Sequence, residues 1–152
     1  MKAPNKLHCF IEEKAEHEEE KTRLEEEKAR KENQIEELTV LSAVAMSGMP
    51  SGSTVSSPVE RFNERLERLN EELRQICEEI LTEIEHIDRC IENIKNYIEN
   101  IDDVEVRVIA RKRFIENKTF QSIGDEMYIE KTTAYKKLKR YFERTETDET
   151  KK

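Results

Sequence analysis

Residues 131–140 concentrate side chains that donate hydrogen bonds or carry positive charge. The segment KTTAYKKLKR holds five basic residues and two threonines and contains no carboxylate. Lys and Arg form charge-assisted hydrogen bonds with phosphate oxygens, and Lys, Arg and Thr also bond to the edges of bases. This chemistry suits a polyanion, and the sequence therefore predicts a DNA-contacting segment.

Apolar residues around these cations predict how the segment is held. Ile123 and Met127 lie one helical turn apart, Gly124 allows a second helix to cross closely, and Ile129 fills the turn. A second helix is predicted from Lys131, with an apolar face formed by Ala134, Tyr135, Leu138 and Phe142. Two helices joined in this way form a helix-turn-helix, whose second helix enters the major groove and contacts bases mainly through its N-terminal residues.

Two classes of DNA contact follow from this arrangement. Base edges are expected to be contacted from the start of the second helix, by Lys131, Thr132, Thr133 and Lys136. Phosphates are expected to be contacted by Lys137, Lys139, Arg140, Arg111, Arg113 and Lys118. Arg113 has an alternative use, an internal ion pair with Glu116 or Glu126.

Other residue types do not assemble into a catalytic or metal site. Glu83 and His86 have the Glu-x-x-His spacing of di-iron four-helix proteins, but such sites need two such pairs and two further glutamates. Neither a Gly-rich phosphate loop nor a nucleophile elbow occurs. We therefore predict no enzymatic activity, no cofactor and no metal site.

Charge is divided unevenly along the 152 residues. The formal net charge is −8, but residues 1–103 hold 14 Lys and Arg against 26 Asp and Glu, whereas residues 104–152 hold 13 against 9. Only the C-terminal part therefore suits a polyanion. No run of 18 apolar residues and no signal-peptide pattern is present, so we expect a cytoplasmic protein without membrane contact. The cysteines Cys9, Cys77 and Cys90 match no zinc spacing and are expected to be reduced.

The strongest periodicity lies in residues 58–101, which are predicted to form one long helix. Ser57, Pro58 and Glu60 supply a capping box at its start. Apolar residues then recur at steps of three and four, with one extra step of four, which is a heptad seam. The expected dimer seam consists of Leu66, Leu69, Leu73, Ile76, Ile80, Ile84, Ile87, Ile91, Ile94 and Ile98.

A helix of this kind cannot bury its seam alone, so it needs either the first helix folded back or a second copy of the chain. Residues 1–45 are predicted to form a charged helix whose apolar stripe is thin. We therefore expect a homodimer in which this helix adds a partial outer layer. Residues 46–59, rich in Gly, Pro and Ser, are predicted to form a flexible loop between the two helices.

Residues 102–144 are predicted to form a trihelical unit, with helices at 102–116, 119–127 and 131–143. Asp102 and Glu105 have capping-box spacing, Asn117 suits a left-handed residue after a helix, and Thr119 suits a cap. Residues 145–152 are predicted to be a disordered tail. The expected fold is all-α: an elongated helical hairpin or coiled coil followed by a helix-turn-helix domain.

The C-terminal segment carries a further ordered set of residues, namely Arg107, Arg113-Phe114-Ile115-Glu116, Phe120, Ile123-Gly124, Thr133, Tyr135 and Lys139-Arg140. In its order this set resembles the last DNA-binding region of bacterial RNA polymerase sigma factors. Tyr128 stands where that turn usually has Gly, and Glu130 replaces the usual Ser or Thr cap. The layout over roughly residues 35–143 is similar to small phage and prophage proteins grouped with the ArpU and RinA late-gene regulators. The resemblance implies DNA binding and control of phage late transcription inside a bacterial host.

Three functions remain open on the sequence. The first is a sequence-specific transcription regulator with double-stranded DNA, a second copy of itself and RNA polymerase as its partners. The second is a small subunit of a phage DNA-packaging machine, which also joins a helix-turn-helix to an oligomerising coil. The third is a coiled-coil adaptor with a degenerate DNA domain. A dimer would favour regulation and a large ring would favour packaging.

Overall fold

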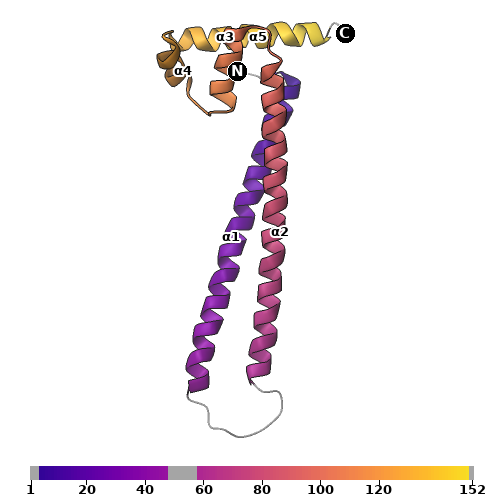
Figure 1. The fold of residues 1–152 in the computed structure, drawn as a ribbon, viewed down its shortest axis with the longest axis vertical. Coiled ribbons are helices and arrows are strands. Elements are labelled where there is room, and N and C mark those ends of the chain that lie inside the picture. Colours follow the sequence, from indigo (N-terminus) through magenta and orange to yellow (C-terminus); the bar gives the residue numbers. More distant parts are fainter. Residues whose placement is uncertain (1–3, 48–57, 151–152) are drawn as a thin grey trace. The chain divides into compact units, whose positions relative to one another are not determined.

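The computed structural model describes residues 4–47 and 58–150, and these residues form five α-helices and no strand. The helices are α1 (Asn5–Ser47), α2 (Pro58–Glu99), α3 (Val104–Phe114), α4 (Phe120–Met127) and α5 (Lys131–Thr150), as Figure 1 shows. The prediction of an all-α protein is confirmed. The chain divides into two compact units: a terminal unit of Met1–His17 and His86–Lys152, and a middle unit of Glu18–Glu85.

The middle unit is held by a small apolar cluster between parts of α1 and α2. Leu24 of α1 is buried with Ile76 and Ile80 of α2, and Ile84 packs against them. An ion pair joins the same two helices, in which the Lys31 Nζ lies 2.8 Å from a Glu72 carboxylate oxygen. This hydrogen bond holds the pKa of Glu72 below its usual value. The pair is only partly buried and remains in contact with solvent, so its net contribution to stability is modest.

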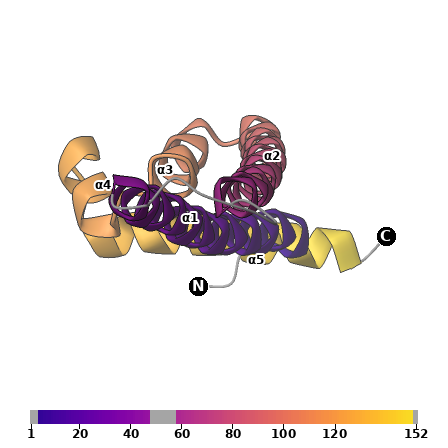
Figure 2. The same ribbon diagram turned by 90° about the horizontal axis from the view of Figure 1, so that it is seen from below.

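The terminal unit has the larger core, and this core joins residues far apart in the chain. Leu7 of α1 is buried with Ile94 and Ile98 of α2 and with Ile101, which follows the end of α2. Phe10 and Ile11 pack against the cluster. Helix α5 runs crosswise to α3, with α4 near its N-terminal end (Figures 1 and 2). The three short helices complete the core with buried Val106, Ile109, Ala110, Ile123, Ala134, Leu138 and Phe142.

The α2 seam is already half covered within one chain. Of the ten residues expected at a dimer interface, five are buried here, namely Leu69, Ile76, Ile80, Ile94 and Ile98. The other five are half-buried, namely Leu66, Leu73, Ile84, Ile87 and Ile91. The thin apolar stripe of α1 covers part of the seam but not the whole of it. In the middle unit Leu24 packs with Ile76 and Ile80, and in the terminal unit Leu7 packs with Ile94 and Ile98.

Helix boundaries differ from the sequence-based ranges at several ends. Helix α2 ends at Glu99 rather than 101, and α3 spans Val104–Phe114 rather than 102–116. The cap of α3 is Asp103, not Asp102: its carboxylate accepts from the N–H groups of Glu105 and Val106, at 3.0 and 3.2 Å. Asn117 is left-handed, with φ 57°, and Thr119 caps α4, both as predicted. Ser57 and most of the expected 46–59 loop lie outside the described residues.

The predicted disordered tail was wrong for residues 145–150, because α5 continues as a helix to Thr150. The Thr145 and Thr147 hydroxyls donate to the carbonyls of Tyr141 and Glu143, both at 2.9 Å, which is the i−4 pattern of threonine in a helix. The segment is polar, and polarity suggested disorder. However, no Gly or Pro follows Phe142, so nothing in the sequence stops the helix.

Candidate nucleic-acid interface

Gly124 sets the distance between α4 and α5. A Cβ atom at this position would lie 2.6 Å from the Ile129 carbonyl oxygen and 3.1 Å from the Lys131 nitrogen. The Gly124 carbonyl oxygen also accepts hydrogen bonds from the backbone N–H groups of Tyr128 and Ile129. The short turn between the helices is therefore fastened to α4 by its own backbone, at a separation that a larger residue would not allow.

The turn begins with Tyr128 in a left-handed conformation, with φ 58° and ψ 38°. The Glu130 carbonyl then accepts from the N–H groups of Thr133 and Ala134, at 3.0 and 3.1 Å, which starts α5. The Glu130 carboxylate accepts a hydrogen bond from the Thr132 hydroxyl at 3.4 Å. Tyr128 thus adopts the backbone that glycine favours, and Glu130 occupies the position where Ser or Thr was expected.

Aromatic contacts fix α5 against the preceding helices. The rings of Phe120 and Tyr135 meet edge to face with centroids 5.4 Å apart, and Phe114 contacts Phe142 at 6.0 Å. The guanidinium of Arg113 lies 4.8 Å from the Phe120 ring centroid. Because Tyr135 is half-buried in this set, its ring orients the helix and leaves the opposite face of α5 outward.

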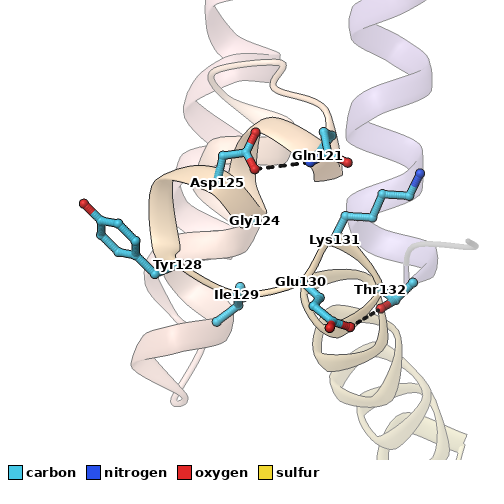
Figure 3. Close-up of a pocket in the computed structure, with 8 residues that line it drawn as sticks. All are labelled: Gln121, Gly124, Asp125, Tyr128, Ile129, Glu130, Lys131 and Thr132. Atoms are coloured by element: carbon cyan, nitrogen blue, oxygen red, sulfur yellow. Dashed lines mark hydrogen bonds between the residues drawn. The ribbon is translucent and has the colours of Figure 1, made fainter.

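The four residues predicted to contact bases lie in the first two turns of α5. Lys131, Thr132 and Lys136 are exposed, whereas Thr133 is half-buried. Lys131 and Thr132 also line a shallow hollow of about 650 Å³ at the turn, together with Gln121, Gly124, Asp125, Tyr128, Ile129 and Glu130 (Figure 3). The structure therefore brings the predicted base-contacting residues together at one end of α5.

Most of the residues predicted to contact phosphates are engaged inside the terminal unit instead. Lys137 Nζ lies 2.6 Å from a Glu105 carboxylate oxygen. Arg111 pairs with Glu99 at 2.6 Å. These cations serve to connect α5 with α3 and α3 with α2, so they are poor candidates for DNA contact.

Arg113 and Lys118 are also held by internal contacts. The Arg113 guanidinium donates to the Lys118 carbonyl at 3.1 Å, so neither Glu116 nor Glu126 is its partner. Lys118 Nζ lies 3.0 Å from Glu116 and 2.7 Å from Glu126. Hydrogen bonds donated by Lys112 and Lys118 hold the pKa of Glu126 below its usual value, and the bonds that Lys118 donates to Glu126 and Glu116 raise the pKa of Lys118. The Glu126 carboxylate therefore stays charged beside these two lysines at neutral pH.

The outward face of α5 carries cations that, unlike Lys137, are not paired with a carboxylate among the described residues. Lys136, Arg140 and Arg144, here called the α5 stripe, are exposed and follow one another at steps of four residues. None of the three has an ion-pair partner within residues 4–47 and 58–150, whereas Lys139 approaches Glu143 at 4.0 Å. Residues four apart share one face of a helix. Sequence reasoning missed Arg144 because it ended the helix at 143.

No metal site is apparent in the part of the chain that the structure describes. Within it, no three His, Cys, Asp or Glu side chains gather closely enough to hold an ion. His86 is half-buried with its ring stacked on that of His17, the centroids being 4.6 Å apart. Burial raises the pKa of the Cys90 thiol.

None of the described helices is long and apolar enough to cross a membrane.

Comparisons with protein-family models, curated proteins and solved structures found no match to this chain.

Proposed function

We propose that the protein is a DNA-binding transcription regulator in which α4, the turn and α5 act as a helix-turn-helix. The supporting observation is the division of cations in the terminal unit. Lys137, Arg111 and Lys118 are paired with carboxylates, whereas the α5 stripe faces outward and is unpaired among the described residues. Unpaired cations on a helix held across its neighbour suit the phosphates beside a major groove.

The paired and unpaired lysines of α5 provide a matched test. Lys136, which the sequence assigned to base edges, is assigned to a phosphate in this proposal. Lys136→Ala is therefore expected to weaken binding to a short mixed-sequence DNA duplex and to reduce the slope of log affinity against log salt by about one unit. Lys137→Ala removes the neighbouring lysine, whose charge already meets Glu105, and should change affinity and slope much less. The measurement is fluorescence anisotropy over a range of salt concentrations. Equal effects of the two variants would contradict the division of roles.

A homodimer is part of this proposal, because dimeric helix-turn-helix proteins place two reading helices on two half-sites. The half-buried part of the α2 seam, which includes Leu66, Leu73 and Ile87, is the surface that a second copy would cover. Leu73→Asp should therefore shift the sedimenting species from dimer to monomer while helicity is retained. Ile94 is unsuitable for this test, since it is buried in the terminal core. A wild-type protein that sediments as a monomer at high concentration would contradict the dimer.

The resemblance to sigma factors adds the narrower parts of the proposal, namely control of phage or prophage late genes in the cytoplasm of a bacterial host, with RNA polymerase as a second partner. The alternatives predict different assemblies. A DNA-packaging subunit would form a large ring, and an adaptor would bind a protein without binding duplex DNA. Selection of bound sequences from a random duplex pool tests the regulator directly, because only sequence-specific binding would enrich one site.

A further inference from the structure

Tyr128 combines two features that are each unfavourable for the isolated chain. Its backbone is left-handed, with φ 58°, although it has a Cβ atom, and its side chain is 95% exposed. Among non-glycine residues, Asn and Asp are the ones that favour this backbone conformation, whereas a large aromatic residue is unusual there. Strained residues of this kind cluster at functional sites. Folding alone does not account for a tyrosine at this position, whereas a binding role for its side chain would.

The tyrosine side chain contributes nothing visible to the turn itself. The hydrogen bonds that close the turn come from the backbone N–H groups of Tyr128 and Ile129 to the Gly124 carbonyl, and glycine at position 128 would make the same bonds. Figure 3 shows the ring pointing away from the other seven residues around the hollow. Within the described residues, no hydrogen bond reaches its hydroxyl. The ring is thus displayed outward at the cost of backbone strain.

We propose that Tyr128 contacts the DNA backbone, with its hydroxyl donating a hydrogen bond to a phosphate oxygen. This inference rests on the proposed helix-turn-helix function. In that docking geometry the second helix enters the major groove while the first crosses the backbone, so the turn between them lies at the edge of the groove. Tyr is among the side chains that donate to DNA phosphates.

The charges around the turn are compatible with this contact. Lys131 follows Tyr128 by three residues and is exposed. The Asp125 carboxylate is directed to the Gln121 amide, which donates to it at 3.2 Å, and the Glu130 carboxylate is directed to Thr132. Figure 3 shows both carboxylates turned away from the Tyr128 ring. A phosphate at the hydroxyl would therefore approach from the side that these acidic groups do not face.

Tyr128→Gly distinguishes a DNA contact from a structural role, because the variant should lose DNA affinity without losing thermal stability. The variant relieves the left-handed strain, so its melting temperature should be equal to or above that of the wild type. Its affinity for a short mixed-sequence duplex should fall about tenfold to a hundredfold, the range for loss of a hydrogen bond to a charged acceptor. The salt slope should stay unchanged, since tyrosine neutralises no phosphate. Tyr128→Phe keeps the ring and the strain, and should lose affinity through the missing hydroxyl alone.

The outcomes separate this inference from the proposed function. Wild-type protein that binds no duplex at low salt would overturn both. Duplex binding that depends on Lys136 but is unchanged in Tyr128→Gly would overturn only the Tyr128 contact. The exposed ring would then be available for a protein partner instead of DNA. Loss of binding together with a lower melting temperature would also overturn it, because the ring would then be structural. Unchanged affinity in Tyr128→Phe would overturn the phosphate hydrogen bond.

Discussion

Replacing Leu7 by alanine is expected to destabilise the whole terminal unit, by about 2–5 kcal/mol. Leu7 is 0% exposed and belongs to the same core as Ile94, Ile98 and Phe142. Truncation removes transfer free energy and leaves a cavity between helices that cannot collapse independently. Urea unfolding measures the loss of free energy. Hydrogen exchange locates it, and faster exchange is expected in α3 and α5 as well as in the first turns of α1.

The matched control for Leu7→Ala is Lys6→Ala, one residue away on the exposed side of the same helical turn. Surface substitutions of this kind usually change stability by less than about 0.5 kcal/mol. If Leu7→Ala accelerates exchange in α1 while α3 and α5 remain protected as in the wild type, the N-terminal segment packs on the core without stabilising the other helices.

Gly124→Ala is expected to weaken both folding and DNA binding. The added Cβ would stand 2.6 Å from the Ile129 carbonyl oxygen, and this backbone atom can move only with the start of α5. Overpacking costs about 1–3 kcal/mol. Alanine gains roughly 1 kcal/mol over glycine in a helix interior, so the net loss for alanine is smaller than the clash alone. Gly124→Val should cost more, since it adds two methyl groups and little propensity.

The control for Gly124→Ala is Ser122→Ala in the same helix, whose hydroxyl makes no hydrogen bond within the described residues. It tests whether any substitution in this helix impairs the protein. Thermal unfolding and duplex affinity are measured together, because a displaced α5 start would reduce binding even in variants that remain folded. A Gly124→Ala protein as stable as the wild type would mean that the two helices tolerate a wider separation than the structure gives them.

The helical content could be predicted from the sequence because its signals are local. The three-four spacing from Phe62 onward identifies α2, and Thr119 and Asn117 mark the boundaries around α4. The core of the terminal unit could not be predicted in the same way. Leu7 stands apart from any seam, so no pattern in its neighbourhood connects it with Ile98.

The candidate site was predictable in its residue types but not in its electrostatics. The sequence identifies every Lys and Arg. Whether one of them is free to bind DNA depends on which carboxylates the folded chain brings close to it. Glu105 reaches Lys137 from α3, and Glu99 reaches Arg111 from the end of α2. Arg144 was missed for a different reason: the last helix was predicted to end at residue 143, although no residue there breaks it.

The position of Leu7 in the terminal core has a consequence for synthesis on the ribosome. Leu7 is translated long before Phe142, and at typical elongation rates the interval is on the order of ten seconds. During that time Leu7, Phe10 and Ile11 lack most of the surface that later covers them. Exposed apolar segments on a nascent chain are where chaperones act and where aggregation begins. The first helix should therefore be the part of this chain that most needs protection before translation ends.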